Sequence, residues 1–344
     1  MQNFWQKIKK NKIITCLAPM ADVSDAPFRQ IIAKYSRHGK TGGGPDVFWT
    51  EFISADGLCS KVGRKKLIHI LKFNRPRRSS RGSDRSVGEN EKPIIAQIFG
   101  ANPLNIEKAC RIIAKLGFAG IDINMGCPDR KVEKQGAGSA LMKNPALARE
   151  IIRSAKKGAG KLPISVKTRL GYNKFEYESW LPEILKENIS ALTIHLRTRK
   201  EMSKVPAHFE IAKDIVRVVR NCDKEVVLIA NGDIQNIEEG KQKAKEAGFD
   251  GIMIGRGIFG NPWLYDSSKK IITTEEKLKV LIEHTKLFNK ILGKIKNYSV
   301  MKKHFKAYVN GFLGAKELRV KLMQTQNVKD VEKVINSFLS CKIK

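Results

Sequence analysis

The chain has 344 residues and a formal net charge of +31, from 65 lysine and arginine against 34 aspartate and glutamate residues. Because 42% of the residues are hydrophobic, the chain can bury a sizeable core, which excludes wholesale disorder. No apolar run approaches the roughly 18 residues of a membrane span, and the stretch Ile13–Met20 is too short for a signal peptide. We therefore expect a cytoplasmic protein of two or three units, or one large barrel with an appendage.

Short apolar runs alternate along the chain with longer segments of helical periodicity. Most of the runs are continuously apolar, which is typical of parallel strands buried on both faces. The expected strands are Ile13–Leu17, Val47–Glu51, Ile94–Ile98, Gly120–Ile123, Ile164–Lys167, Ala191–His195, Val226–Ala230 and Gly251–Ile254. Eight β-then-α units in about 260 residues predict a (β/α)8 TIM barrel, with a doubly wound open sheet as the alternative.

Helix boundaries are marked at several places between these strands. The segment Leu104–Leu116 has helical periodicity, and Asn144 followed by Pro145 is typical of a helix N-terminus. Glycines that mark expected helix ends are Gly117, Gly158 and Gly248.

The strand pattern stops at Tyr265, and residues 275–341 read as helices with breaks near Gly293, Gly314 and Asn327. We therefore expect a barrel domain over residues 1–265 and a small all-helical domain over residues 266–344. From Ser267 onward there are 18 basic and 6 acidic residues, about twice the positive charge density of the preceding chain. Arg75–Arg85 forms a further basic segment, which reads as an extended insertion before the third strand. This charge favours a polyanionic partner, and a solvated lysine-rich surface is the alternative.

The cysteine spacing narrows the class of protein. Because no two cysteines form a C-x-x-C pair, a zinc ribbon, an iron–sulfur run and a disulfide scaffold are all disfavoured. We expect free thiols and no metal site, the cysteines being Cys16, Cys59, Cys110, Cys127, Cys222 and Cys341.

Polar residues gather at the carboxyl ends of the expected strands, where barrel enzymes hold their active sites. The fifth strand ends at Lys167 and the sixth at His195, and these side chains would converge on one small volume. Glycine-rich turns, Asn231–Asp233 and Gly255–Gly257, follow the last two strands and offer backbone N–H groups in the usual phosphate position of barrels. The pattern predicts a phosphorylated cofactor or substrate. The G-x-G-x-x-G match at Gly255–Gly260 follows the last strand, so it is weak support for a dinucleotide fold.

Eight segments of the chain resemble the tRNA-dihydrouridine synthases, with the bacterial B-type branch as the nearest pattern. They are LAPMADVSDAPFR, TEFISADGL, AQIFGANP, GIDINMGCPDRKVEKQGAGSALMKNP, ISVKTRLG, LTIHLRTR, ANGDI and GIMIGRGIFGNPW. The tail HFKAYVNGFLGAKELR is similar to the helical domain of that family, so the likeness runs from about Ile13 to about Leu322. The Arg75–Arg85 segment departs from the family pattern by its length.

The resemblance implies an FMN-bound barrel that reduces the C5–C6 double bond of uracil in the D-loop of tRNA, with NADPH as the electron donor. Hydride would pass from flavin N5 to C6, and Cys127 would give a proton to C5. A thiol with an ordinary pKa of about 8.5 is protonated at neutral pH and can act as this acid. The family is usually monomeric.

The resemblance also assigns binding residues. Pro19, Met20 and Ala21 would lie along the flavin, with Gln97 and Lys167 at its polar ring edge and His195 beside the ring and phosphate. The phosphate would be held by Asn231, Gly232, Asp233, Gly255 and Arg256. Asn124 would lie near the target uracil. Candidates for RNA or flavin phosphate contacts, with rim ion pairs as the alternative, are Arg169, Arg197 and Arg199.

Two other functions stay open at this point. A flavin-dependent dihydroorotate or dihydropyrimidine oxidoreductase shares the barrel and the cysteine but has no need of the +31 charge. An RNA-binding protein without activity would have no need to retain Cys127, Lys167 and His195 together.

Overall fold

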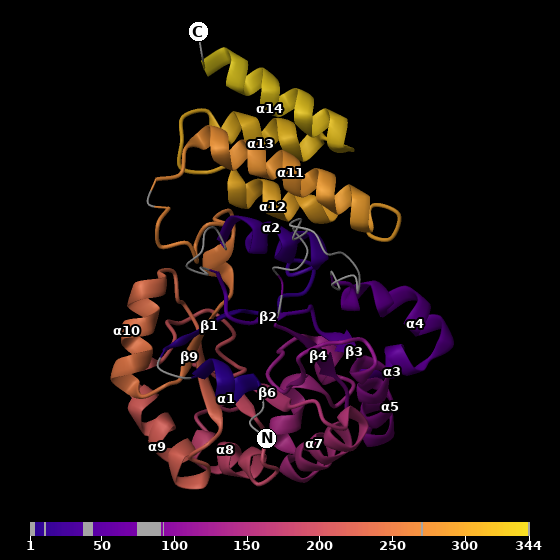
Figure 1. Ribbon diagram of the computed structural model, residues 1–344, viewed down its shortest axis with the longest axis vertical. Coiled ribbons are helices and arrows are strands. Elements are labelled where there is room, and N and C mark those ends of the chain that lie inside the picture. The colour runs from indigo at the N-terminus through magenta and orange to yellow at the C-terminus, as the bar shows by residue number, and fades with distance from the viewer. Residues whose placement is uncertain are drawn as a thin grey trace, which may run out of the picture.

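Parallel strands form a closed barrel in the computed structural model, which describes residues 4–9, 12–36, 44–73, 91, 93–269 and 271–342 (Figure 1). The strand order is β1-β9-β8-β7-β6-β5-β4-β2, and a bridge between Cys16 and Val47 joins the two ends of this series. Closure confirms the barrel and rules out the open sheet. The strands are β1 (Ile14–Leu17), β2 (Phe48–Trp49), β3 (Ile53–Ser54), β4 (Ile94–Phe99), β5 (Gly120–Asn124), β6 (Ile164–Arg169), β7 (Ala191–His195), β8 (Val227–Asn231) and β9 (Gly251–Ile254).

The second expected strand, Val47–Glu51, is wrong as a continuous element. It is shortened to β2, and a further short strand, β3, follows beyond it; both pair with β4. Between them, Thr50 turns its hydroxyl to the backbone, accepting the Gln97 N–H and donating to the Glu51 carbonyl. The Glu51 carboxylate leaves the sheet and accepts the backbone N–H of Asp22. The regular strand is therefore interrupted where Thr50 and Glu51 make these polar contacts. The hydrophobic pattern of the sequence does not predict this interruption.

Helices surround the barrel, and their ends follow the sequence signals at most places. Asn144 caps its helix by accepting the Leu147 N–H, and Gly248 ends another with φ of +87°. Gly158 is not a helix end. It lies inside α7, where a Cβ would approach the carbonyl oxygen of Glu107 to 2.1 Å, so it allows α5 and α7 to pack closely. The helices of this layer are α2 (Ala26–Ser36), α3 (Ala55–Cys59), α4 (Lys61–Leu67), α5 (Pro103–Ala114), α6 (Arg130–Glu133), α7 (Pro145–Ala159), α8 (Tyr177–Leu185), α9 (Ala212–Cys222) and α10 (Ile237–Ala247).

A short N-terminal helix, α1 (Phe4–Lys9), closes one end of the barrel and is drawn inside the ring of strands in Figure 1. Trp5 is fully buried, with its ring 5.8 Å from that of Trp49. It packs in a cluster with residues from several strands, among them Ile14, Val227 and Met253. No pattern in the sequence predicted this helix. It leaves the opposite end, at the carboxyl ends of the strands, as the end that is open to ligands.

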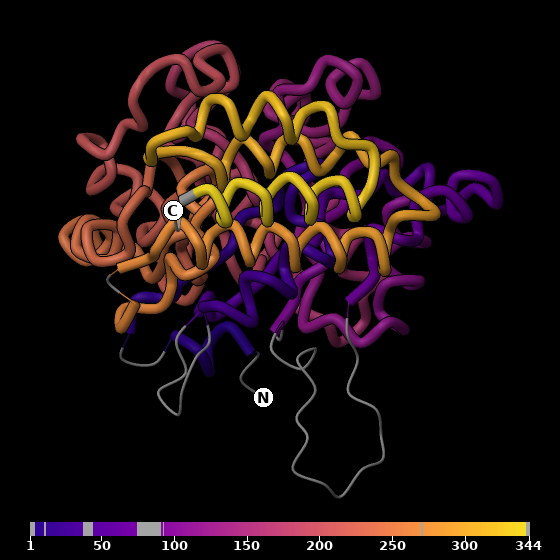
Figure 2. Tube along the Cα trace, turned by 90° about the horizontal axis from the view of Figure 1, so that it is seen from above, coloured from indigo at the N-terminus to yellow at the C-terminus, as the bar shows by residue number. Residues whose placement is uncertain are grey.

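Four further helices form a layer beside the barrel, next to α2 (Figures 1 and 2). They are α11 (Thr274–Leu292), α12 (Met301–Tyr308), α13 (Ala315–Gln324) and α14 (Val328–Lys342), with breaks where the sequence predicts them. Their core contains Phe288 and Phe305 and also takes in Ile31 of α2 and Trp263 from the barrel side. Trp263 belongs to the helical core although it lies on the barrel side of the predicted domain boundary between residues 265 and 266. The position of this boundary therefore stays a prediction.

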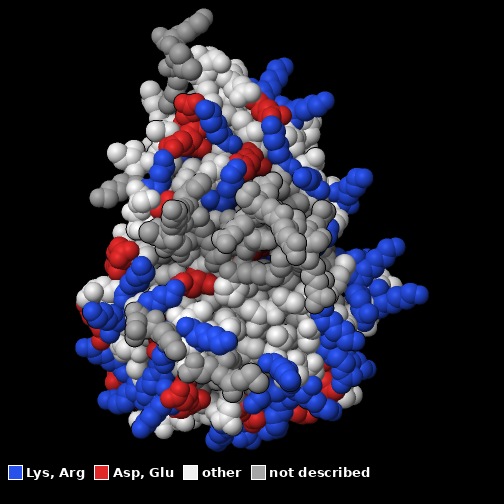
Figure 3. All heavy atoms as spheres, in the orientation of Figure 1, with Lys and Arg blue, Asp and Glu red and all other residues white. Residues whose placement is uncertain are grey.

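Lysine and arginine side chains are spread over both parts of the molecule on the face drawn in Figure 3. Within the described ranges, no helix combines the length and apolarity that crossing a membrane requires. The basic segment Arg75–Arg85 lies outside the described residues.

Candidate functional site

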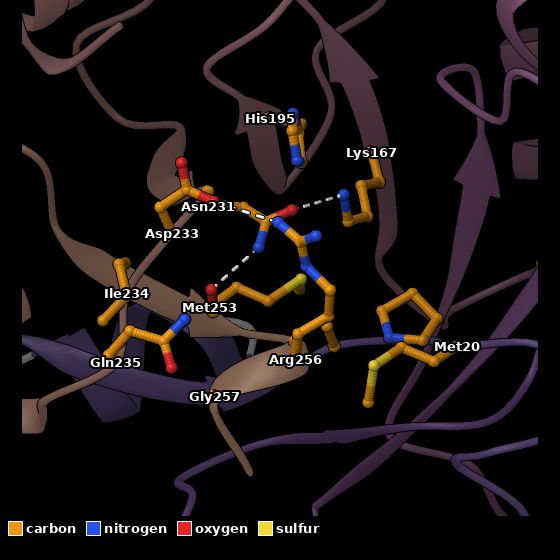
Figure 4. Close-up of a pocket in the computed structure, with 14 residues that line it drawn as sticks. Met20, Lys167, His195, Asn231, Asp233, Ile234, Gln235, Met253, Arg256 and Gly257 are labelled. Atoms are coloured by element: carbon orange, nitrogen blue, oxygen red, sulfur yellow. Dashed lines mark hydrogen bonds and ion pairs between the residues drawn. The ribbon is translucent and has the colours of Figure 1, made fainter. Parts of the chain in front are cut away.

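A cavity opens at the carboxyl ends of β1, β6, β7, β8 and β9 (Figure 4). It brings together most of the predicted cofactor residues, although these are far apart in the chain. Its lining consists of Ala18, Pro19, Met20, Lys167, His195, Asn231, Gly232, Asp233, Ile234, Gln235, Met253, Gly255, Arg256 and Gly257. The structure therefore brings together around one cavity residues that the strand-end rule selects, and their role stays a prediction.

Lys167 reaches across the cavity from β6 to β8. Its Nζ donates to Asn231 Oδ1 at 2.8 Å, and Asn231 Nδ2 donates in turn to the Met253 carbonyl at 2.8 Å (Figure 4). Burial, with help from the positive charge of Arg169, lowers the pKa of Lys167 to about 7. The neutral amide of Asn231 orients the ammonium without neutralising it. An anionic ligand in this cavity would therefore stabilise the charged form of Lys167.

His195, at the end of β7, lies between two guanidinium groups. Arg169 Nη1 is 3.5 Å from its Nδ1, and Arg197 Nη1 is 3.5 Å from its Nε2. Burial, followed by the charges of Arg169 and Lys167, holds the pKa of His195 well below its ordinary value. The imidazole is therefore neutral at pH 7, and it offers one donor and one acceptor to a ligand.

Asp233 is the one carboxylate among the residues that line this cavity, and it is committed to neighbouring groups. It pairs with Arg197, accepts the Ala207 N–H at 2.9 Å and lies 3.1 Å from Arg256 Nη2. The hydrogen bond from Arg197 holds the pKa of Asp233 below its ordinary value. Gly232, with φ of +133°, permits this turn, because a Cβ there would meet Ala207 at 2.8 Å.

The cavity suits the anionic group of FMN. Lys167 and Arg256 line it with a single carboxylate, Asp233, which Arg197 also pairs with, so positive groups outnumber negative ones here. Gly255 leaves room at the centre, since a Cβ there would meet only Met20 Sδ at 3.7 Å and Ala18 Cβ at 3.8 Å. A phosphate and a polar ring edge both fit this set of donors.

Cys127 follows β5 in a loop that is held by Asn124. The Oδ1 atom of Asn124 accepts the N–H groups of Gly126 at 3.1 Å and Cys127 at 2.9 Å. Ser139 donates its hydroxyl to the Cys127 carbonyl at 2.8 Å, which fixes the far side of the loop. Cys127 does not line the cavity but lies half-buried beside a small apolar cluster that includes Phe99. Burial raises the pKa of its thiol, so the thiol is protonated at neutral pH.

Gln97 also lies behind the cavity rather than in its wall. It is fully buried, donates from Nε2 to Asp122 at 2.6 Å and accepts from Asn124 Nδ2 at 3.0 Å. Asp122 in turn accepts the Ser165 hydroxyl at 2.6 Å, and burial raises its pKa to about 6. The network connects the centre of the barrel to the Cys127 loop through Asn124, an arrangement that the sequence did not indicate.

The three candidate arginines all have partners within the chain. Arg169 donates to the carbonyls of Gly126 at 2.8 Å and Thr198 at 3.0 Å, and burial lowers its pKa to about 10. Arg197 is buried and pairs with Asp233, whereas Arg199 pairs with Glu133 and lies over the Tyr172 ring. Arg197 and Arg199 therefore form ion pairs within the chain, whereas Arg169 donates to backbone carbonyls. A contact of these arginines with RNA stays a prediction.

The remaining differences concern the edges of the cavity. Ala21 is exposed and does not belong to the lining. Gly257 of the predicted Gly255–Gly257 turn lines the cavity. Sequence reasoning missed Ala18, Ile234, Gln235 and Met253, which also line it. Each stands within two residues of a predicted site residue or is the last but one of β9, so their places at strand ends were the available signal.

Comparisons with known proteins identify the family of this chain. The family described as Dihydrouridine synthase (Dus) matches residues 16–342. A "Probable tRNA-dihydrouridine synthase" of Staphylococcus aureus (strain COL) is 40% identical over 339 residues, covering 98% of this chain and 96% of its own. A "Probable tRNA-dihydrouridine synthase 2" of Bacillus subtilis (strain 168) is also 40% identical, covering 98% and 97%.

Solved structures with a similar trace include the old yellow enzyme homologue of Zymomonas mobilis (TM-score 0.48, 14% identity, 77% of this chain and 90% of that one). Morphinone reductase in complex with tetrahydroNAD has a TM-score of 0.46 at 11% identity, covering 74% and 84%. The family match spans almost the whole chain, and the chain belongs to the dihydrouridine synthase family.

Proposed function

We propose that this dihydrouridine synthase acts on tRNA, uses FMN and NADPH, and belongs to the B-type branch of the bacterial enzymes. The curated relatives support the tRNA substrate through their names. The single observation that carries the cofactor assignment is the cavity at the strand ends, where Lys167, His195 and Arg256 line one space.

The residues of the cavity would hold FMN in two ways. Arg256, Gly232 and Gly255 would bind the phosphate, while Lys167 would face the polar edge of the ring, oriented by Asn231. Pro19 and Met20 would lie along the ring, with the exposed Ala21 beyond the lining and Gln97 supporting the site from behind. When bound, FMN supplies the hydride that adds to C6 of uracil. A charged Lys167 stabilises negative charge on the reduced ring, which the low dielectric of the site strengthens.

Cys127 is the proposed proton donor to C5. Reduction of the conjugated double bond leaves negative charge on C5 and the C4 carbonyl, and this charge takes up one proton. A half-buried thiol with a raised pKa retains its proton until that base appears, as a general acid must. Asn124 holds the backbone of Cys127 and would lie near the target base.

The helical layer is proposed to bind tRNA together with the barrel rim. Its 18 basic against 6 acidic residues from Ser267 onward suit a phosphate backbone. The base must leave its stack to reach the cavity, at a cost of a few kcal/mol that phosphate contacts offset. Arg169, Arg197 and Arg199 shape the rim and would act on RNA through its positive potential. We also propose a cytoplasmic monomer.

The test is a spectrum followed by an assay. The purified protein is expected to show flavin absorbance and, with NADPH, to form dihydrouridine in unmodified tRNA. Free uracil, orotate and dihydroorotate serve as the comparison substrates. Turnover of these free pyrimidines without product on tRNA would overturn the tRNA assignment in favour of a small-molecule oxidoreductase. Absence of bound flavin, even after reconstitution with FMN, would overturn the cofactor assignment.

A further inference from the structure

A lysine from the helical layer reaches a loop that helps to form the cavity wall. Lys296 follows α11, and its Nζ lies 3.0 and 3.1 Å from the two carboxylate oxygens of Glu51 and 3.4 Å from Asp22. Glu51 is 4% exposed, and it stands between β2 and β3 of the barrel. Figure 1 shows α12, the next helix along, directly beside α2, which the loop containing Asp22 enters. The contact therefore joins the two parts of the molecule.

Glu51 connects Lys296 to the backbone of the loop that contains Asp22. Its Oε1 atom accepts the N–H of Asp22 at 2.7 Å. Asp22 has φ of +54°, a left-handed conformation that costs free energy for a residue other than glycine and persists where the surroundings impose it. Two residues earlier, Met20 lines the cavity, and its carbonyl accepts the N–H of Ser24 at 3.0 Å. A shift of Asp22 would therefore move the cavity wall.

The electrostatics show that the contact is not an ordinary surface pair. Burial alone would lower the pKa of Lys296, but the carboxylates of Glu51 and Asp25 outweigh this effect and raise that pKa. The side chain of Lys296 is 11% exposed and that of Glu51 5%, so salt screens them weakly. Removal of the lysine would leave the Glu51 charge buried without its cation, which such sites tolerate poorly.

We propose that Lys296 is a positioning residue, which through Glu51 holds the loop of residues 18–24 in the shape that the cavity needs. The inference depends on the proposed function only in the identity of the ligand that the cavity binds. In this arrangement the seating of the helical layer, which is proposed to contact tRNA, sets the geometry of the wall beside the flavin. Binding of RNA on one part is thereby linked to the site on the other.

The first test needs no activity. In Lys296→Met, hydrogen exchange of the amides of residues 20–24 is expected to accelerate by about tenfold or more, since a charge-assisted bond is lost. Lys294→Met removes the same charge from an exposed lysine two residues away and is expected to leave this exchange unchanged. Lys296→Arg, which retains the cation, is expected to restore protection. Unchanged exchange at Asp22 in Lys296→Met would overturn the proposal.

Two further measurements separate positioning from general loosening. Glu51→Gln keeps Lys296 but removes the charge, and it is expected to accelerate exchange in the same loop rather than throughout α11–α14. An equal acceleration over the whole chain in both variants would overturn a local role. In the flavoprotein, Lys296→Met is expected to lower kcat for tRNA reduction. Its KM for tRNA is expected to be no higher than the KM of the Lys294→Met variant. Failure of the wild-type protein to form dihydrouridine would refute the proposed function but leave the exchange result standing.

Discussion

Asn124→Ala is the substitution that most directly tests how the structure positions its proton donor. It removes the acceptor of the Gly126 and Cys127 N–H groups, at 3.1 and 2.9 Å, and the donor to Gln97 at 3.0 Å. Each net hydrogen bond contributes about 0.5–1.5 kcal/mol, so the three predict a loss of about 2–4 kcal/mol in the free energy of unfolding. The freed loop also lets Cys127 move, and a displacement of about 1 Å can cost about 100-fold in rate.

The assay separates the two halves of the reaction. NADPH oxidation by the flavoprotein is expected to persist in Asn124→Ala, because Asn124 does not line the cavity. Dihydrouridine formation is expected to fall by about 100-fold. Ser60→Ala is the matched control, since it removes the side-chain cap of α4, 67 residues before Cys127, and costs about 1 kcal/mol. If product formation falls no further in Asn124→Ala than in Ser60→Ala, Asn124 does not position Cys127.

Three other predictions address the cofactor, the helical layer and acid stability. Lys167→Met is expected to raise the Kd for FMN, measured by titration of the apoprotein, because the ammonium held by Asn231 is lost; an unchanged Kd would refute its place in the cavity. Replacing the exposed Lys306 and Lys316 by Gln is expected to weaken tRNA binding. The slope of log Kd against log salt concentration is expected to fall by about 0.9 for each phosphate that is no longer neutralised, and an unchanged slope would place the RNA elsewhere. Burial lowers the pKa of His304 to about 3, so the unfolded chain binds a proton below about pH 6.5 that the folded chain does not, and stability falls as pH drops from there. Between pH 7 and pH 5, urea unfolding should show a loss about 2 kcal/mol greater in the wild type than in His304→Gln, in which the buried His195 and His284 still contribute, and equal losses in both would contradict it.

The barrel could be predicted because its strands are buried on both faces. Runs such as Val226–Ala230 are apolar at every position, and a continuous run is visible in a single sequence. The cofactor cavity follows from the same rule, since closure of the barrel brings Lys167, His195 and Asn231 to one end. The residues around the cavity could therefore be predicted from the sequence, because closure of the barrel alone decides which strand ends meet.

The parts that escaped prediction depend on contacts between residues far apart in the sequence. The second strand breaks because Glu51 bonds to Asp22, 29 residues away. The ion pair of Arg199 with Glu133 likewise joins residues 66 apart in the sequence. Trp5 closes the barrel only because a complementary floor forms from distant strands. The hydrophobic periodicity of the sequence does not indicate which distant residues will be in contact.

The central claim is that Cys127 gives the proton to a base that flavin reduces. The direct measurement is a single turnover, in which FMN-loaded protein is first reduced with NADPH and then mixed with unmodified tRNA without oxygen. In the wild type, loss of the reduced-flavin spectrum is expected to accompany dihydrouridine formation. In Cys127→Ala, flavin binding and reduction by NADPH are expected to persist, while reoxidation by tRNA slows by about 100-fold or more. Equal rates of reoxidation by tRNA in the two proteins would contradict the account.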